Sequence, residues 1–183
     1  MSGRLEVVCG PMFSGKTEEL IRRLRRSELL SPVYCFKPRI DDRYHKESIV
    51  SHSKQSFSST VVDTSSNIRE HLARVSAPVT VGIEEVQFLD DGVVDLIREL
   101  VARDFTVVVA GLDMDYMCKP FMITATLLAC ADKILKLHSI CMGCHGKATK
   151  TYKKLLDGAG RIAVGGSEMY EPRCSSCHDL GAR

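Results

Sequence analysis

Short apolar runs of strand length alternate along the chain with longer segments whose apolar positions recur at helical spacing. Apart from the two-residue run Val61–Val62, each is five or six residues long and ends at a polar or glycine-rich turn, as expected for buried strands. The predicted strands are Leu5–Cys9, Pro32–Lys37, Val61–Val62, Val79–Ile83, Thr106–Ala110 and, nearer the sheet edge, Lys133–Leu137.

Between these runs the spacing predicts helices. One covers Thr17–Arg26, and a second begins in a capping box at Asn67 and continues to about Val75. A third opens at Asp90-Asp91-Gly92 and places its apolar residues on one face. Alternating strands and helices predict an α/β fold with a parallel sheet, in which ligands bind beyond the carboxyl ends of the strands.

The stretch Gly10–Thr17 (GPMFSGKT) has the pattern of a phosphate-binding loop, G-x-x-x-x-G-K-[ST]. Its glycines let successive backbone N–H groups face a phosphate, and the following helix adds the positive end of its dipole. Lys16 is expected to reach the β- and γ-phosphates, and the Thr17 hydroxyl to bind Mg²⁺. The residues assigned to the nucleotide in this loop are Gly10, Pro11, Met12, Phe13, Ser14, Gly15, Lys16 and Thr17.

Two carboxylates, Glu84 and Glu85, end the apolar strand Val79–Ile83. Alternation along the strand sends them to different sides. We assign Glu84 to Mg²⁺ and Glu85 to the general base that a kinase acting on an alcohol needs, the alternative being a solvated acidic turn. Val86 and Gln87, which follow, are grouped with the nucleotide-binding residues.

The segment Pro38–Thr60 lacks periodicity and is predicted to be a long loop, which in a compact domain is usually functional. Asp41 and Arg43 in this loop are candidates for clamping nucleotide and metal. The arginines of the first helix, by contrast, are interpreted as a solvated face rather than a phosphate or subunit contact.

Eight cysteines include two C-x-x-C pairs, Cys141/Cys144 and Cys174/Cys177. Four thiolates make a closed structural zinc site, and we favour this reading over two disulfides or free thiols. His145 and His178 each follow a pair and either replace a thiolate or lie outside the site. The remaining cysteines, Cys9, Cys35, Cys118 and Cys130, are interpreted as small buried hydrophobes or chance thiols.

Composition narrows the function classes. The chain has 183 residues with 44% hydrophobic content, enough for one domain with a core and a small appendage. A net charge of +2 gives no electrostatic argument for nucleic acid or a membrane. The absence of a signal peptide or an apolar run long enough to span a bilayer predicts a reducing cytoplasm.

Taken together and in order, five motifs resemble the type II, zinc-containing thymidine kinases. They are Gly10–Thr17, Ile40–Tyr44 (IDDRY), Ile83–Phe88 (IEEVQF), Lys119–Phe121 (KPF) and the paired cysteine knuckles. The resemblance extends from about Leu5 to Cys177. It implies a RecA-like P-loop parallel sheet with helices on it over residues 1–138, and a small zinc-binding lasso domain over residues 139–183.

The resemblance also implies an activity: transfer of a phosphoryl group from ATP to thymidine, with Glu85 as base and with Lys16 and Arg43 on the phosphates. Family members are commonly homotetramers that dTTP inhibits from the active site. The implied thymidine-binding residues are Met12, Leu112, Tyr116, Phe121, Thr151, Arg161, Ile162, Ala163, Val164, Gly165 and Tyr170.

The sequence departs from the family pattern at Glu84, where Asp is usual, and at Tyr116, where Phe is frequent. A second function class is a zinc-knuckle nucleic-acid-binding P-loop NTPase, suggested by the basic stretch Lys147–Lys154. Near-neutral charge and the lack of an aromatic platform weigh against it.

Overall fold

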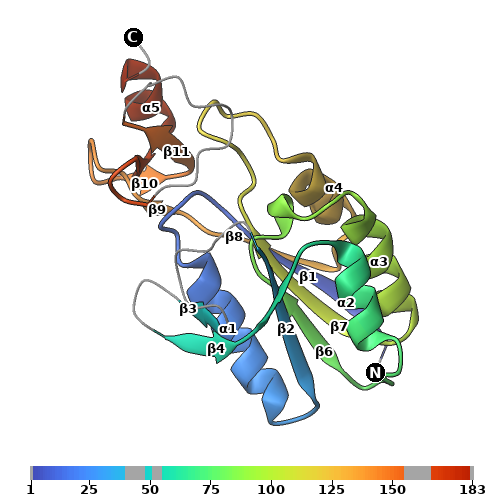
Figure 1. The fold of residues 1–183 in the computed structure, drawn as a ribbon. Helices are drawn as coiled ribbons and strands as arrows, with labels where there is room; N and C mark the ends of the chain where they lie inside the picture. The colour runs from blue at the N-terminus through green and yellow to red at the C-terminus, as the bar shows by residue number, and fades with distance from the viewer. Residues whose placement is uncertain (1, 40–47, 51–54, 155–165, 182–183) are drawn as a thin grey trace.

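The fold is built on a six-stranded, wholly parallel sheet in the order β5-β2-β6-β7-β1-β8 (Figure 1). The computed structural model describes residues 2–39, 48–50, 55–154 and 166–181. The strands of the sheet are β1 (Arg4–Cys9), β2 (Val33–Pro38), β5 (Thr60–Val62), β6 (Thr80–Ile83), β7 (Thr106–Gly111) and β8 (Lys133–Lys136). The α/β class and the edge position of β8 are therefore confirmed.

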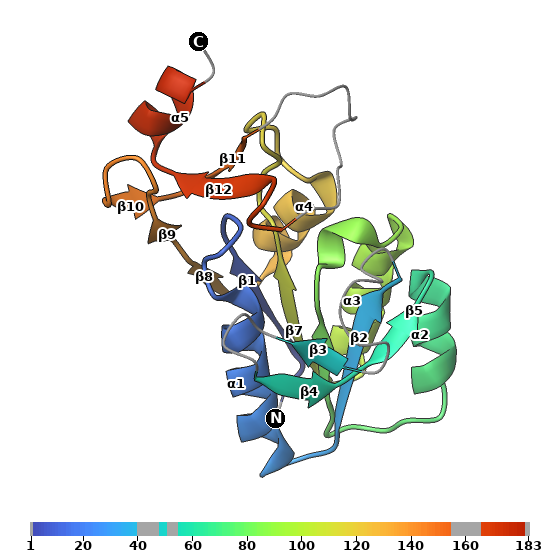
Figure 2. The same cartoon turned by 60° about the vertical axis from the view of Figure 1, so that its left-hand side comes forward.

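Helices cover both faces of the sheet (Figures 1 and 2). One face packs against α1 (Lys16–Glu28), and the other packs against α2 (Ser65–Leu72), α3 (Gly92–Ala102) and α4 (Met122–Cys130). Period-two alternation divides β7 between the layers, since Val107 and Val109 join the α3 side and Val108 the α1 side. Gly82 on β6 permits the close approach of α1, because a Cβ there would lie 2.7 Å from Leu24 Cδ1.

Three expectations from the sequence were wrong in detail. The segment Pro38–Thr60 contains an antiparallel hairpin, β3 (Ser48–Val50) with β4 (Ser56–Ser58), because Ile49 and Phe57 pair across it and pack under α1. Helix α2 starts earlier than expected: Thr64 is its N-cap, and Asn67 is the third helical residue of the capping box.

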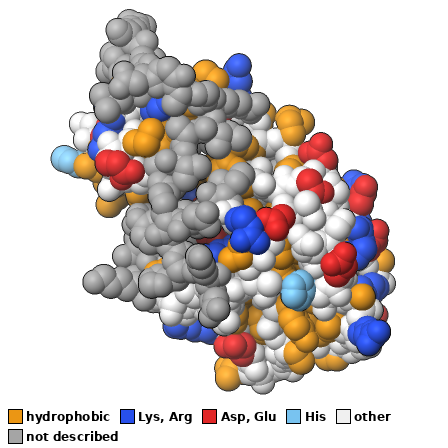
Figure 3. Space-filling view, viewed as in Figure 1, with side chains coloured by type: hydrophobic (Ala, Val, Ile, Leu, Met, Phe, Trp, Pro, Cys, Tyr) orange, Lys and Arg blue, Asp and Glu red, His pale blue; other side chains and the backbone are white. Residues whose placement is uncertain are grey.

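The third correction concerns the arginines of α1. Arg23 is not solvated: its side chain is 10% exposed and bonds Glu6 on β1 at 2.6 Å and Glu19 at 2.8 Å. A carboxylate in the middle of β1 needs a partner when α1 buries it, and Arg23 supplies that partner. On the opposite helical layer, charges of both signs are interspersed at the surface (Figure 3), where Arg69 of α2 pairs with Glu99 of α3.

The rest of the chain forms small paired strands beyond the carboxyl edge of the sheet (Figure 2). It comprises β9 (Ser139–Ile140), β10 (Lys147–Ala148), β11 (Lys150–Lys153), β12 (Tyr170–Arg173) and α5 (Ser175–Gly181). β9 pairs with β10, and β11 pairs with β12, both antiparallel. No described helix has the length and apolarity needed to cross a membrane.

Candidate active site

The loop between β1 and α1 has the backbone that a phosphate site needs. Gly10 and Gly15 have φ of 148° and 83°, values that glycine adopts without strain. A Cβ at Gly10 would lie 2.6 Å from the carbonyl oxygen of Leu137. Lys16 is 7% exposed and donates from Nζ to the Pro11 carbonyl at 2.8 Å, so its ammonium folds back over the loop.

Residues far along the chain tie down this loop. The backbone N–H of Met12 donates to Thr151 Oγ1 on β11 at 3.0 Å. The carbonyl of Phe13, a residue with φ of 61°, accepts from Ser139 Oγ on β9 at 2.9 Å. The C-terminal region thus fixes the loop directly and brings the predicted residues Met12 and Thr151 into contact.

The two acids that end β6 have different surroundings, as the alternation predicts. Glu84 is 6% exposed and accepts a hydrogen bond from the Thr17 hydroxyl at its Oε1, 2.5 Å away. The two groups expected to serve Mg²⁺ are therefore adjacent, and their oxygen donors suit that ion. Glu85 is only half-buried and has left-handed backbone angles (φ 48°, ψ 44°) at the start of the 3₁₀ turn η1 (Val86–Phe88).

Glu85 is connected to the loop after β7 through Gln87. The Gln87 amide donates from Nε2 to Glu85 Oε2 at 2.5 Å, and its Oε1 accepts from the Leu112 backbone N–H at 3.1 Å. Phe121, at the far end of that loop, packs edge-on against Phe88 with 6.1 Å between ring centroids. Leu112 and Phe121 therefore lie on the same side of the site as Glu85.

Tyr116, in the middle of that loop, faces the C-terminal strands. The Nζ of Lys153 on β11 lies 5.1 Å from the centroid of the Tyr116 ring, and the Tyr116 carbonyl is 3.0 Å from His178 Nε2. Tyr170 on β12 is 5% exposed and lines a cavity of about 490 Å³ together with Phe13. Asp41, Arg43 and residues 161–165 lie outside the described residues.

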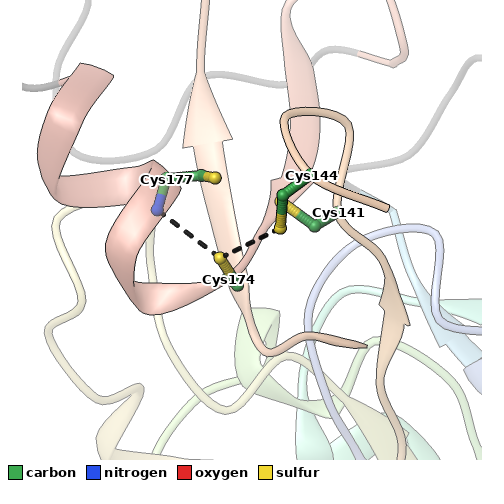
Figure 4. A group of neighbouring side chains, drawn as sticks. All are labelled: Cys141, Cys144, Cys174 and Cys177. Atoms are coloured by element: carbon green, nitrogen blue, oxygen red, sulfur yellow. Dashed lines mark hydrogen bonds between the residues drawn. The ribbon is translucent and has the colours of Figure 1, made fainter. Parts of the chain in front are cut away.

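The four knuckle cysteines converge as predicted (Figure 4). Their sulfurs all lie within 4.8 Å of one another, and Cys144 Sγ is 3.7 Å from Cys174 Sγ. A tetrahedral zinc ion with Zn–S bonds of about 2.3 Å separates its sulfurs by about 3.8 Å, so the cluster fits zinc. All eight cysteines are free thiols, which excludes the two-disulfide alternative in this structure.

The electrostatics of the cluster also suit a cation. Backbone N–H groups, that of Cys174 foremost, lower the pKa of Cys141 to about 6, whereas the neighbouring sulfur of Cys174 raises the pKa of Cys177 to about 12. Four adjacent thiolates repel one another, and a dication removes that repulsion.

Sequence reasoning missed several buried polar groups around the site. Lys153 is 4% exposed beneath Tyr116. His178 contacts the Tyr116 carbonyl and lies outside the cysteine cluster, which is one of the two alternatives given for it. Asp113 and Asp115 are also buried, and Asp113 pairs with Lys136 at 2.8 Å. Both acids follow the end of β7, so the rule that singled out Glu84 and Glu85 could have found them.

Comparison with known proteins identifies the family to which this chain is similar. The sequence model of the family described as "Thymidine kinase" matches residues 3–178. The thymidine kinase of Bacteroides thetaiotaomicron is 42% identical over 177 residues, which are 96% of this chain and 87% of that protein. The thymidine kinase of Rhodothermus sp. is 43% identical over 96% of this chain and 81% of its own length.

Solved structures are more distant. The genome packaging NTPase B204 of Sulfolobus turreted icosahedral virus 2 has a TM-score of 0.49 at 12% identity, covering 76% of each chain. The Holliday junction branch migration motor RuvB of Thermotoga maritima has a TM-score of 0.43 at 13% identity. That match covers 73% of this chain and 37% of RuvB, and neither likeness bears on the activity of this chain.

Proposed function

This chain belongs to the thymidine kinase family, and from that premise we propose that it transfers the γ-phosphate of ATP to the 5′-hydroxyl of thymidine, giving dTMP. The observation that carries the proposal is the meeting of a formed phosphate loop with two acids of different environment at one edge of the sheet. A kinase needs both parts, one to hold the donor phosphates and one to accept the proton of the alcohol.

The residues of the site divide between these tasks. Gly10–Thr17 hold the phosphates through backbone N–H groups, with Lys16 neutralising charge on the transferred group and Arg43 assisting from its loop. Glu84 and Thr17 hold Mg²⁺, which on binding neutralises phosphate charge. Glu85, tied to Gln87, accepts the proton of the 5′-hydroxyl.

Thymidine is proposed to lie between the phosphate loop and the loop after β7. Met12, Leu112, Tyr116 and Phe121 give it apolar and aromatic surroundings, and Thr151 and Tyr170 border it from the C-terminal strands. We assign recognition of the base edge to backbone groups of residues 161–165. Residues 139–183 act as the zinc-binding lasso domain, and residues 1–138 as the kinase domain.

Two further proposals come from the family resemblance. The protein is expected to assemble as a homotetramer, and dTTP is expected to inhibit it by occupying the active site. Sedimentation measurements and inhibition of thymidine phosphorylation by dTTP test the two proposals separately.

A nucleoside panel with labelled ATP and Mg²⁺ tests the substrate assignment. Backbone groups that pair with thymine N3–H and a thymine carbonyl meet no partners on cytosine. Each unpaired buried group costs about 1–3 kcal/mol. We therefore expect kcat/KM for thymidine to exceed that for deoxycytidine by on the order of 10²–10⁴. Equal values for the two nucleosides would refute the assignment.

A further inference from the structure

The amide of Gln87 occupies a junction between the proposed base and the nucleoside side of the site. Its Nε2 donates to Glu85 Oε2 at 2.5 Å, and its Oε1 accepts from the backbone N–H of Leu112 at 3.1 Å. The side chain is 7% exposed, so water does not compete freely for either bond. Both ends of one buried amide are therefore engaged inside the protein.

The backbone conformation of Glu85 indicates why its side chain needs this hydrogen bond. Glu85 has φ of 48° and ψ of 44°, the left-handed region that costs a non-glycine residue free energy. A strained, half-buried residue stays in place only when its surroundings hold it. Among the described residues, Gln87 donates a hydrogen bond to the Glu85 carboxylate and so helps to hold it.

The neighbouring strand is shaped around the same amide. A Cβ at Gly111, the last residue of β7, would lie 2.6 Å from Gln87 Oε1 and 3.0 Å from Val86 Cγ1. Gly111 therefore leaves the space that Gln87 needs to reach the N–H of Leu112. Three observations, the two hydrogen bonds and the absent side chain at Gly111, converge on one side chain.

We infer that Gln87 is a positioning residue, which holds the Glu85 carboxylate toward the acceptor hydroxyl and couples it to the Leu112 end of the nucleoside pocket. This inference rests on the proposed function, because it presupposes that Glu85 is the base. Gln87, which the sequence grouped with the nucleotide-binding residues, is here assigned to Glu85 and not to ATP. Its loss is expected to lower kcat and leave KM for ATP within about twofold.

Two substitutions separate the two hydrogen bonds. Gln87→Met keeps the length of the side chain and removes both bonds. Gln87→Glu keeps an oxygen that accepts from Leu112 N–H, but replaces the donor with a carboxylate facing Glu85. We expect both variants to lose at least about tenfold in kcat, and only Gln87→Met to lose protection of the Leu112 amide in hydrogen exchange.

A double-mutant cycle tests whether Gln87 acts through Glu85. Gln87→Met should cost less than about twofold in kcat when Glu85 is already Gln, because the group that it positions is gone. Gly111→Ala, which displaces the amide from the opposite side, should reproduce the kcat loss of Gln87→Met. Leu89→Ala is the packing control: it removes a buried side chain next to η1 and leaves both hydrogen bonds, so Tm should fall with kcat within about twofold.

The outcomes are distinct. Equal losses from Gln87→Met with and without Glu85→Gln, or a kcat within twofold of wild type, would overturn the inference. A Leu112 amide that stays protected in Gln87→Met would overturn the coupling to the nucleoside pocket. If the wild-type protein does not phosphorylate thymidine, the proposed function fails, whereas hydrogen exchange at Leu112 still decides whether Gln87 holds the junction.

Discussion

The sheet region and the C-terminal cysteine region of this molecule are stabilised by different means. The parallel sheet buries two continuous apolar clusters, one on each face, beneath four helices. In the described part of residues 139–183, the buried apolar residues are Cys141, Ala148, Tyr170 and Pro172. The first region can fold by apolar burial, whereas the described part of the second buries few apolar residues and gathers four sulfurs that can bind a stabilising metal ion.

The two regions contribute different groups to the candidate active site. The sheet presents Lys16, Glu84 and Glu85 at the carboxyl ends of its strands, on a scaffold with its own core. The cysteine region adds the contacts that close the site, Thr151 on the phosphate loop and Lys153 beneath Tyr116. Damage to the sheet-borne groups should therefore remove chemistry, and damage to the cysteine region should weaken nucleoside binding.

The largest expected effect is that of Lys16→Ala. This change removes the positive charge that we assign to the transferred phosphate and should lower kcat by on the order of 10³–10⁵, the effect that an arginine finger has on the transferred group in other phosphoryl transfers. Steady-state kinetics with labelled ATP measure the loss, and Tm should stay within a few degrees. Lys133→Ala, an exposed lysine on β8, is the control. Turnover near wild type in Lys16→Ala would contradict the phosphate-loop assignment.

Glu85→Gln should have the next largest effect. Removing a general base costs roughly 10²–10⁴ in kcat, and KM for ATP should change little. Glu84→Gln is the matched variant: because Glu84 contacts Thr17, it should chiefly raise the Mg²⁺ concentration required for activity. If Glu84→Gln lowered kcat at saturating Mg²⁺ more than Glu85→Gln does, the two roles would be reversed.

Cys174→Ser tests the cysteine region itself. The purified protein should hold one zinc ion per chain, by elemental analysis, and the variant should hold less. Because β11 then loses its support, KM for thymidine should rise about tenfold to a hundredfold, with a smaller change in kcat. Cys130→Ser, an exposed cysteine outside the cluster, should change neither quantity. If reduced protein without zinc were fully active, the cysteine region would not depend on a metal ion, and the proposed difference between the two regions would be wrong.

The smallest effect concerns the ion pairs that Glu19 forms with Arg22 and Arg23 within α1. Hydrogen bonds from Arg22 and Arg23 outweigh the effect of burial and lower the pKa of Glu19 from 4.5 to about 2. The ionised Glu19 therefore stabilises the fold above about pH 4.5, and this contribution is lost as the pH falls toward 2.

Glu19→Gln should lower the free energy of unfolding at pH 7 by on the order of 1 kcal/mol, the contribution of hydrogen bonds to a charged group, and flatten its dependence on pH in that window. Urea unfolding at several pH values measures both changes. Glu28→Gln, an exposed residue at the end of the same helix, is the control. An unchanged acid slope in Glu19→Gln would show that this ion pair contributes no stability.

The sequence predicted the sheet well because its signals are local. Apolar runs such as Val79–Ile83 and the glycine spacing of the phosphate loop depend on neighbouring residues, and both appear in the structure where expected. The cysteine cluster could also be predicted, because each C-x-x-C pair is a short local motif typical of metal sites. Roles taken from the family resemblance, such as that of Arg43, remain predictions.

The features that the sequence did not predict are mostly contacts between residues far apart in the chain. The link between Arg23 and Glu6 joins a helix to a strand, and a run of four arginines conceals which one faces inward. The partnership of Met12 with Thr151 crosses most of the chain, and periodicity carries no information about it. The hairpin within Pro38–Thr60 was missed because three-residue strands are too short to show alternation.

The two hydrogen bonds that fix the phosphate loop also determine when, during synthesis, the loop can reach its final structure. The loop is made early, but its partners Ser139 and Thr151 follow it by 126 and 139 residues. A growing chain folds its N-terminal sheet first, so the Met12 N–H and the Phe13 carbonyl face water until those residues leave the ribosome. The last stage of maturation thus completes the first motif of the chain, and zinc bound at the four cysteines would influence a phosphate loop that contains none of them.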